Sequence, residues 1–210
     1  MPIIESIQVA SVAVPLDKVT SFSTRTVSER HYCLVKVRGK DGNEGIGFCY
    51  VGSAGGDIAK VAVEQLLAPK LIGQNSHRSE GLWMEMYNES ILQGRTGAVM
   101  RGISILDTAL WDLNARSVGL PLHQYLGSVV DDRVPAYASG GYYLEGKTPA
   151  KLGKEMESYV KQGFKAVKMK VGRLSPSEEE ARVKAARKAV GDDVLLTLDA
   201  NNAWRDLPTA

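Results

Sequence analysis

The second part of the sequence alternates between strand patterns and helix patterns, and this order constrains the fold more than any other feature. The successive patterns are a short strand at "RVPAYASGG", a helix from Thr148 to about Gly163, a strand in "KAVKMKVGR", a helix from Ser175 to Val190 and a strand at "VLLTLDAN". The order βαβαβ implies a parallel sheet, and the apolar last run is typical of a strand that is covered on both faces. Asp206 is a candidate cap for one more helix.

The length of this part limits how much of a larger fold it contains. One strand–helix unit takes about thirty residues, and an eight-unit barrel typically takes about 250. Residues 134–210 therefore hold fewer than three units. If the sheet belongs to a barrel, we expect the chain to stop less than halfway round it, with an open sheet edge. Residues 1–210 expressed alone are then expected to be marginally stable and inactive.

The first part reads as an α+β unit that ends near Gly127. "IIESIQVASVAV" alternates as a strand does, and "HYCLVKVRG" and "EGIGFCYVG" flank Asp41-Gly42, a strong hairpin signal. We expect the polar stretch "PLDKVTSFSTRTVSER" between the first strand and this hairpin to be a mobile loop. Each strand of this hairpin contains a cysteine, Cys33 and Cys49, which we interpret as small core residues.

Three helices follow this hairpin in the sequence. The first is predicted to run up to Pro69, the second lies in "SEGLWMEMYNES", and the third ends at Gly119 and Pro121. The third has apolar residues at helical spacing, which predicts one buried stripe. These residues are Val99, Ile103, Leu106, Leu110 and Leu113.

Composition excludes several classes of partner. The net charge is +2 and no dense Lys/Arg block occurs, which argues against nucleic acid or an anionic membrane as the main partner. No apolar run approaches about 18 residues, and no signal peptide is visible. Two cysteines fit a reducing compartment, so we expect a cytoplasmic protein. Three scattered histidines and the lack of a Cys-x-x-Cys pattern argue against zinc.

The lysine-containing strand raises a chemical question. Lys168 and Lys170 alternate with apolar residues and so share one face, which must point into a lumen or crevice if the other face packs on helices. Two neighbouring, partly desolvated ammonium groups lower each other's pKa, and a lysine so affected can act as a general base near pH 7. The alternative is a surface strand whose lysines are simply solvated.

The next strand favours the first interpretation. It ends in Asp199 and Asn201, and parallel strands bring their carboxyl ends to one rim, where such folds hold ligands. Asp199 is a hard oxygen ligand that suits Mg²⁺, with the other ligands supplied elsewhere. Ser139 and Tyr142 end the first strand of the sheet and are candidates for substrate contact, although ordinary rim polarity explains them slightly better.

Three further interpretations compete with an enzyme: a phosphate-binding loop, a nucleotide-binding domain and a non-catalytic fragment. The glycine-rich "VGSAGG" at 51–56 precedes a helix, but it lacks both the P-loop ending and the full G-x-G-x-x-G spacing. A small doubly wound nucleotide-binding domain also begins βαβαβ, yet no glycine fingerprint follows "VPAYASGG". The remaining alternative is a non-catalytic fragment that needs a partner or a missing half.

Three segments together resemble the mandelate racemase/muconate lactonizing enzyme family of the enolase superfamily. "GFKAVKMKVG" is similar to its Lys-x-Lys strand, and "LTLDANNAW" to the strand with its first metal ligand. "ISILDTALWDLNARSVGLPLHQYLG" resembles the signature helix of its capping domain. The resemblance implies an α+β N-terminal capping domain, residues 1–127, followed by the first three βα units of a TIM-type barrel in residues 128–210, the rest of which lies beyond this chain.

The resemblance also implies a chemistry. Lys170 would remove the proton α to a substrate carboxylate, and Lys168 would hold that carboxylate and lower the pKa of Lys170. Asp199 would bind Mg²⁺, and Asn201 would touch the substrate or the metal shell. The family's other acidic ligands and its second acid/base come from later strands.

The substrate implied is a small carboxylic acid, an acid sugar or a related hydroxy acid. An acid-sugar dehydratase is the leading expectation because a β-hydroxyl leaving group suits an ene-diolate. A racemase or epimerase and a cycloisomerase are the alternatives. The segment at 51–56 and the polar stretch at 21–28 would cover the site and select the substrate, and a homo-oligomer is expected for the full-length protein.

Overall fold

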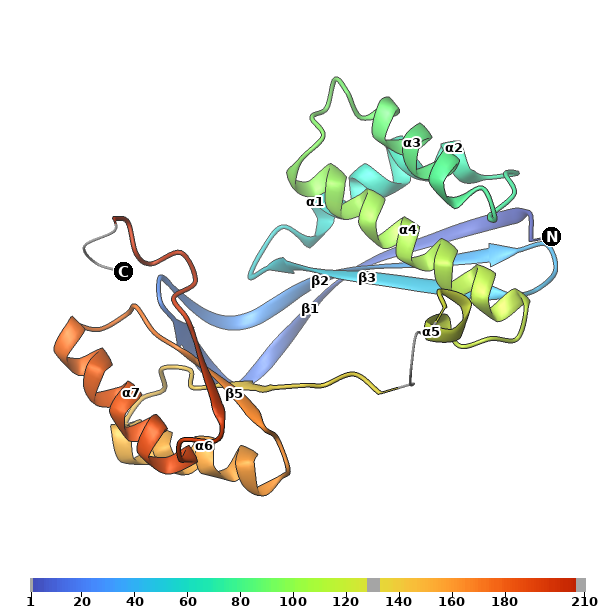
Figure 1. Ribbon diagram of the computed structural model, residues 1–210. Helices are drawn as coiled ribbons and strands as arrows, with labels where there is room; N and C mark the ends of the chain where they lie inside the picture. Colours follow the sequence, from blue (N-terminus) through green and yellow to red (C-terminus); the bar gives the residue numbers. More distant parts are fainter. Residues whose placement is uncertain (1, 128–132, 207–210) are drawn as a thin grey trace. The chain divides into compact units, whose positions relative to one another are not determined.

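The computed structural model describes residues 2–127 and 133–206, and the chain divides into two compact units (Figure 1). The first unit lies within residues 1–15 and 29–132, and the second within residues 16–28 and 133–210. A further helix after Asp206 falls outside the described residues. No helix in the described part of the chain is long and apolar enough to cross a membrane.

The first unit is built on an antiparallel sheet of three strands in the order β1-β2-β3. The strands are β1 (Ile4–Phe22), β2 (Arg25–Gly39) and β3 (Glu44–Gly52). The predicted Asp41-Gly42 turn joins β2 to β3, and Gly42 takes a φ of 83° that favours glycine. The hairpin prediction is therefore confirmed.

The polar stretch 15–30 is not a loop, so this prediction is wrong. Strands β1 and β2 continue through it as a two-stranded ribbon, and only Ser23 and Thr24 form the turn. Half of its residues are exposed and only Ser23 and Val27 are buried, so the ribbon lacks the alternation that a half-buried strand shows. Backbone pairing and β-branched residues such as Val19 and Thr20 hold it extended instead.

The helices of the first unit follow the sheet. They are α1 (Gly56–Val61), a π-helical segment (Ala62–Leu67), α2 (Ala68–Leu71), α3 (Ser79–Glu89), α4 (Gly97–Ser117) and α5 (Leu122–Tyr125). The first predicted helix does not end at Pro69 but continues to Leu71, because Pro69 lies in the first turn of α2, where a missing N–H is tolerated.

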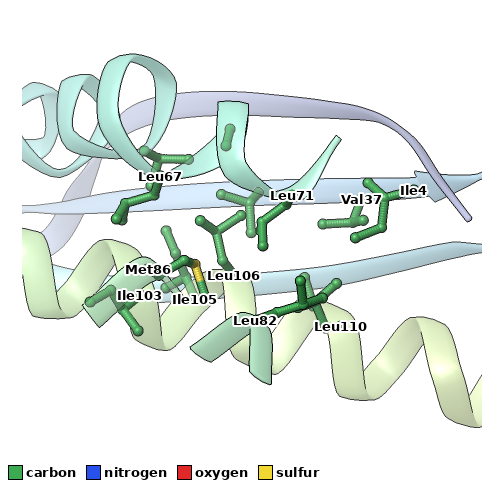
Figure 2. Close-up of a cluster of buried hydrophobic side chains, with 14 of the residues drawn as sticks. Ile4, Val37, Leu67, Leu71, Leu82, Met86, Ile103, Ile105, Leu106 and Leu110 are labelled. Atoms are coloured by element: carbon green, nitrogen blue, oxygen red, sulfur yellow. The ribbon is translucent and has the colours of Figure 1, made fainter. Parts of the chain in front are cut away.

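The core of the first unit lies between the sheet and the helices (Figure 2). Ile103, Leu106, Leu110 and Leu113 of α4 are fully buried, which confirms the predicted stripe, and Val99 packs partly buried against them. Cys33 is fully buried and Cys49 packs beside it as a partly buried residue, so both are core residues.

The second unit contains a parallel sheet in the order β4-β5-β6. Its elements are β4 (Ala138–Gly140), α6 (Pro149–Lys161), β5 (Ala166–Lys170), α7 (Pro176–Val190) and β6 (Leu195–Asp199). The expected order is confirmed. Thr148 caps α6, and Ser175 and Glu178 form a capping box at the start of α7. Val167 and Met169 are fully buried against the helices, with Leu152, Met156 and Ala186.

Helix α4 approaches β3 so closely that two glycines are required. A Cβ at Gly45 would lie 2.1 Å from the Ala109 carbonyl oxygen, and one at Gly47 would lie 2.1 Å from that of Ile105. Both obstacles are backbone atoms, which cannot rotate away as a side chain can.

We predict that Gly45→Ala lowers the free energy of unfolding by about 3 kcal/mol, because the helix must move off the strand. Chemical denaturation followed by circular dichroism measures this. Ile46→Ala is the control, because Ile46 lies beside Gly45 and its side chain is 55% exposed; its effect should stay below about 1 kcal/mol. Equal losses in the two variants would contradict the prediction.

Candidate active site

The register of the parallel sheet brings the predicted residues together. Ser139 of β4 pairs with Lys168 of β5, and Lys170 pairs with Asp199 of β6. Lys170 Nζ donates to Asp199 Oδ2 at 2.7 Å, and Lys168 Nζ lies 3.3 Å from the same oxygen. One carboxylate oxygen therefore holds two ammonium groups at the carboxyl end of the sheet.

The two lysines are not solvated surface residues. The side chain of Lys170 is 8% exposed and that of Lys168 is 21% exposed. A charge this deep requires a partner, because its hydration is lost. Asp199 supplies one negative charge for two positive ones, so the three side chains carry a net charge of +1 that favours an anionic ligand.

Asp199 is held in its ionised form. Its pKa falls to about 2, chiefly because Lys170 donates a hydrogen bond to the carboxylate, with smaller contributions from the Asn201 N–H and from Lys168. Asn201 N donates to Oδ1 at 2.9 Å, so both carboxylate oxygens are engaged. Because the folded pKa is depressed, this interaction stabilises the fold above the unfolded value of 3.8 and is lost as the pH falls through about 2.

Three aromatic rings surround the ammonium groups. The Tyr142 ring centroid lies 5.5 Å from Lys170 Nζ, that of Phe22 lies 5.9 Å from it, and that of Tyr137 lies 5.5 Å from Lys168 Nζ. Ring faces attract cations, so they partly replace lost water. Sequence reasoning missed Phe22 and Tyr137. Tyr137 has a weak signal, since it lies two residues before Ser139 and would share its face in an extended chain. Phe22 has none, because it lies in the stretch predicted to be a loop.

The tip of the β1–β2 ribbon belongs to the second unit and is bonded to its other residues. Ser21 and Tyr143 exchange backbone hydrogen bonds of 2.9 and 3.1 Å, and Ser23 Oγ donates to the Val171 carbonyl at 2.6 Å. These contacts hold Phe22 near Lys170. The glycine-rich segment 51–56 belongs to the first unit.

The remaining candidates line the same rim. Ser139 is exposed and Tyr142 is half-buried. Asn201 and Asn202 have φ angles of 47° and 63°, a left-handed conformation that asparagine tolerates better than most residues. The Asn201 side-chain oxygen is buried and has no hydrogen-bond partner within the described residues, so it is an acceptor that a ligand can satisfy.

Asp199 suits a magnesium ion as one ligand only. Among residues 2–127 and 133–206, no group of three or more His, Cys, Asp or Glu side chains is placed to hold a metal. Its carboxylate is hard and ionised, as Mg²⁺ requires. The other ligands of such a site must lie beyond the described residues.

We predict that Lys170→Met raises the pKa of Asp199 from about 2 toward its ordinary value of 3.8, because the strongest hydrogen bond to the carboxylate is removed. Lys168→Met should produce a smaller rise, since its ammonium lies farther away and contributes less. An NMR titration of the carboxyl carbon in metal-free protein measures both values. A larger rise in the Lys168 variant would contradict this arrangement.

Comparison with known proteins identifies the family of the chain. Residues 4–127 match the model of the mandelate racemase/muconate lactonizing enzyme N-terminal domain, and residues 151–210 match the enolase C-terminal domain-like model. An arabinonate dehydratase from Saccharolobus solfataricus is 41% identical over 148 residues, which are 70% of this chain and 39% of that protein.

Two further relatives cover nearly the whole chain. A 3,6-anhydro-alpha-L-galactonate cycloisomerase from Streptomyces coelicolor is 33% identical over 96% of this chain and 55% of its own length. A racemase from Streptomyces coelicolor A3(2), solved as a crystal structure with bound magnesium, is 31% identical in sequence and superimposes with a TM-score of 0.89. The match covers 97% of this chain and 56% of the racemase chain. The chain thus spans about half the length of these two proteins. It belongs to the mandelate racemase/muconate lactonizing enzyme family of the enolase superfamily.

Proposed function

We propose that this chain is part of a Mg²⁺-dependent enzyme that removes the α-proton of a carboxylate substrate. The observation that supports this most strongly is the convergence of Lys168 and Lys170 on one oxygen of Asp199 at a sheet rim. A structural ion pair needs one lysine, whereas here a second ammonium group is held in the same place. The positive charge of the two ammonium groups is only half compensated by Asp199 until an anion binds.

Each side chain receives a role in this proposal. Lys170, the more buried lysine, takes the α-proton as a neutral amine after it has lost its own proton, and Lys168 as an ammonium group binds a substrate carboxylate oxygen. Tyr142 and Ser139 contact the substrate from β4, and Asn201 offers its unpartnered oxygen to a substrate hydroxyl. Phe22 and Tyr137 limit the water around the two amines.

The metal is assigned to Asp199 together with ligands from outside the described residues. When bound, Mg²⁺ supplies positive charge that stabilises the negative charge developing on the carboxylate oxygens. Residues 1–127 form the capping domain and residues 128–210 the start of the barrel domain in this proposal.

An acid-sugar dehydratase is the reaction that we favour. Loss of the α-proton followed by departure of a β-hydroxyl group as water converts a 2,3-dihydroxy acid into an enol, which becomes a 2-keto-3-deoxy acid. The arabinonate dehydratase at 41% identity supports this choice. Return of the proton to the opposite face would instead make the protein a racemase or epimerase, and attack by a substrate group would make it a cycloisomerase; the relatives named above include proteins of both kinds.

The thiols support a reducing compartment, and we place the protein in the cytoplasm. Cys33 and Cys49 pair directly across β2 and β3, yet both are free. Burial raises the pKa of the Cys33 thiol to about 11, which keeps it protonated and unreactive. A homo-oligomer remains a prediction.

Lys170→Ala is predicted to abolish α-proton exchange, because the base is removed. The protein expressed from its full open reading frame would be incubated with arabinonate and other aldonic acids in D₂O, and deuterium at the α-carbon would be followed by NMR. Lys165→Ala is the control, because Lys165 precedes the same strand and is exposed. Exchange near the wild-type rate in the Lys170 variant would overturn the assignment.

Asp199→Asn is predicted to weaken Mg²⁺ binding at least tenfold, because a charged oxygen ligand becomes neutral. Isothermal titration calorimetry on the same full-length protein measures the affinity. Asp193→Asn, in the exposed turn before β6, is the matched control and should bind Mg²⁺ normally. If the two variants bind alike, the metal is not held by Asp199.

A further inference from the structure

A buried arginine on α7 is bonded to the backbone of the proposed base. Arg182 is 5% exposed, and its Nη1 donates to the Lys170 carbonyl at 3.1 Å. Its Nη2 donates to the Gly141 carbonyl at 2.8 Å. The planar guanidinium therefore connects the carboxyl ends of β4 and β5, at Lys170 itself and at the residue before Tyr142.

A glutamate one turn earlier on α7 fixes the segment that follows the base. Glu179 Oε1 accepts the backbone N–H groups of Gly172, Arg173 and Leu174, each at 3.0 Å, and also the hydroxyl of Tyr143. Arg182 Nη1 donates to Glu179 Oε2 at 2.9 Å, so the partly buried carboxylate compensates the charge of the buried guanidinium.

The same network reaches β4. The Arg182 guanidinium lies 3.9 Å from the centre of the Tyr143 ring. The Gly141 N–H donates to Glu155 Oε1 at 3.1 Å while its carbonyl accepts from Arg182, so the strand end before Tyr142 is held from both sides. Gly141 has no room for a side chain, since a Cβ would lie 2.6 Å from that of Met169.

We propose that Arg182 and Glu179 are positioning residues that fix Lys170 for proton abstraction. The inference rests on the proposed function of Lys170. Neither side chain has to touch the substrate. Their bonds determine where the Lys170 Cα and the following turn lie, and an error of about 1 Å in the position of a catalytic group can cost about 100-fold in rate.

A second arginine, at the other end of α7, is half-buried and also donates to backbone carbonyls, but it lies away from the site. Arg187 Nη1 donates to the carbonyls of Gly191 and Val194, at 2.6 and 2.8 Å. These groups lie at the amino end of β6, the opposite end from Asp199. Arg187 therefore offers the same chemistry on the same helix, away from Lys170.

The test compares Arg182→Lys with Arg187→Lys in the protein from the full open reading frame. Lysine keeps the charge but cannot form the fork to two carbonyls. We expect Arg182→Lys to lower kcat for α-proton exchange about 100-fold, with KM changed less than about threefold, and Arg187→Lys to keep kcat. Equal activity of the two variants, whether both retained or both lost, would overturn the proposal.

Crystal structures of the wild type and Arg182→Lys give a readout that needs no substrate. The separation of Lys170 Nζ and Asp199 Oδ2, 2.7 Å in the native chain, should lengthen by about 1 Å in the variant. An unchanged separation overturns the positioning role even if the wild type exchanges no proton, an outcome that would by itself refute the proposed function.

A second variant covers the case in which Arg182→Lys does not fold. Tyr143→Phe removes one donor to Glu179 and the acceptor of the Arg173 N–H, but it leaves both charges in place. We expect kcat to fall about tenfold with KM retained. A wild-type kcat in this variant would count against the network.

Discussion

The register between β5 and β6 is the constraint on which the site depends. Lys170 is paired with Asp199, so both side chains leave the sheet on the same face, and the alternate residues Met169 and Leu198 leave it on the other. A shift of one residue would turn Asp199 toward the helices and leave the buried ammonium without a partner. The packing of Val167 and Met169 under the helices therefore selects the register that creates the site.

The charge balance at the site follows from this register. A single carboxylate oxygen faces two ammonium groups, and aromatic rings occupy positions where water would otherwise compensate the excess. An excess positive charge in a poorly hydrated place is costly for a resting protein. Such a cost is typical of anion-binding sites, because a bound anion compensates the excess charge and so removes the electrostatic cost that the folded protein carries without it.

Much of this arrangement could be predicted because local patterns and tertiary structure agree. The Asp41-Gly42 turn, the stripe of α4 and the alternation around Lys168 each have a short-range signal. The ribbon at 15–30 was missed because few of its residues are buried, so its strands carry no alternation. Phe22 and Arg182 were missed for a different reason. Their partners Lys170 and Gly141 are distant in sequence, and no pattern of single residues encodes a contact of that kind.

The β1–β2 ribbon contains residues of both units. It begins in a strand that belongs to the first unit, and its tip between residues 16 and 28 belongs to the second. Within the tip only Ser23 and Val27 are buried and Phe22 lies beside Lys170, so most of the other positions are free of the packing demands that fix the core of either unit. Mutations there can accumulate at little cost in folding free energy. Most side chains of the tip can thus change while the lysines and the strand register stay unchanged.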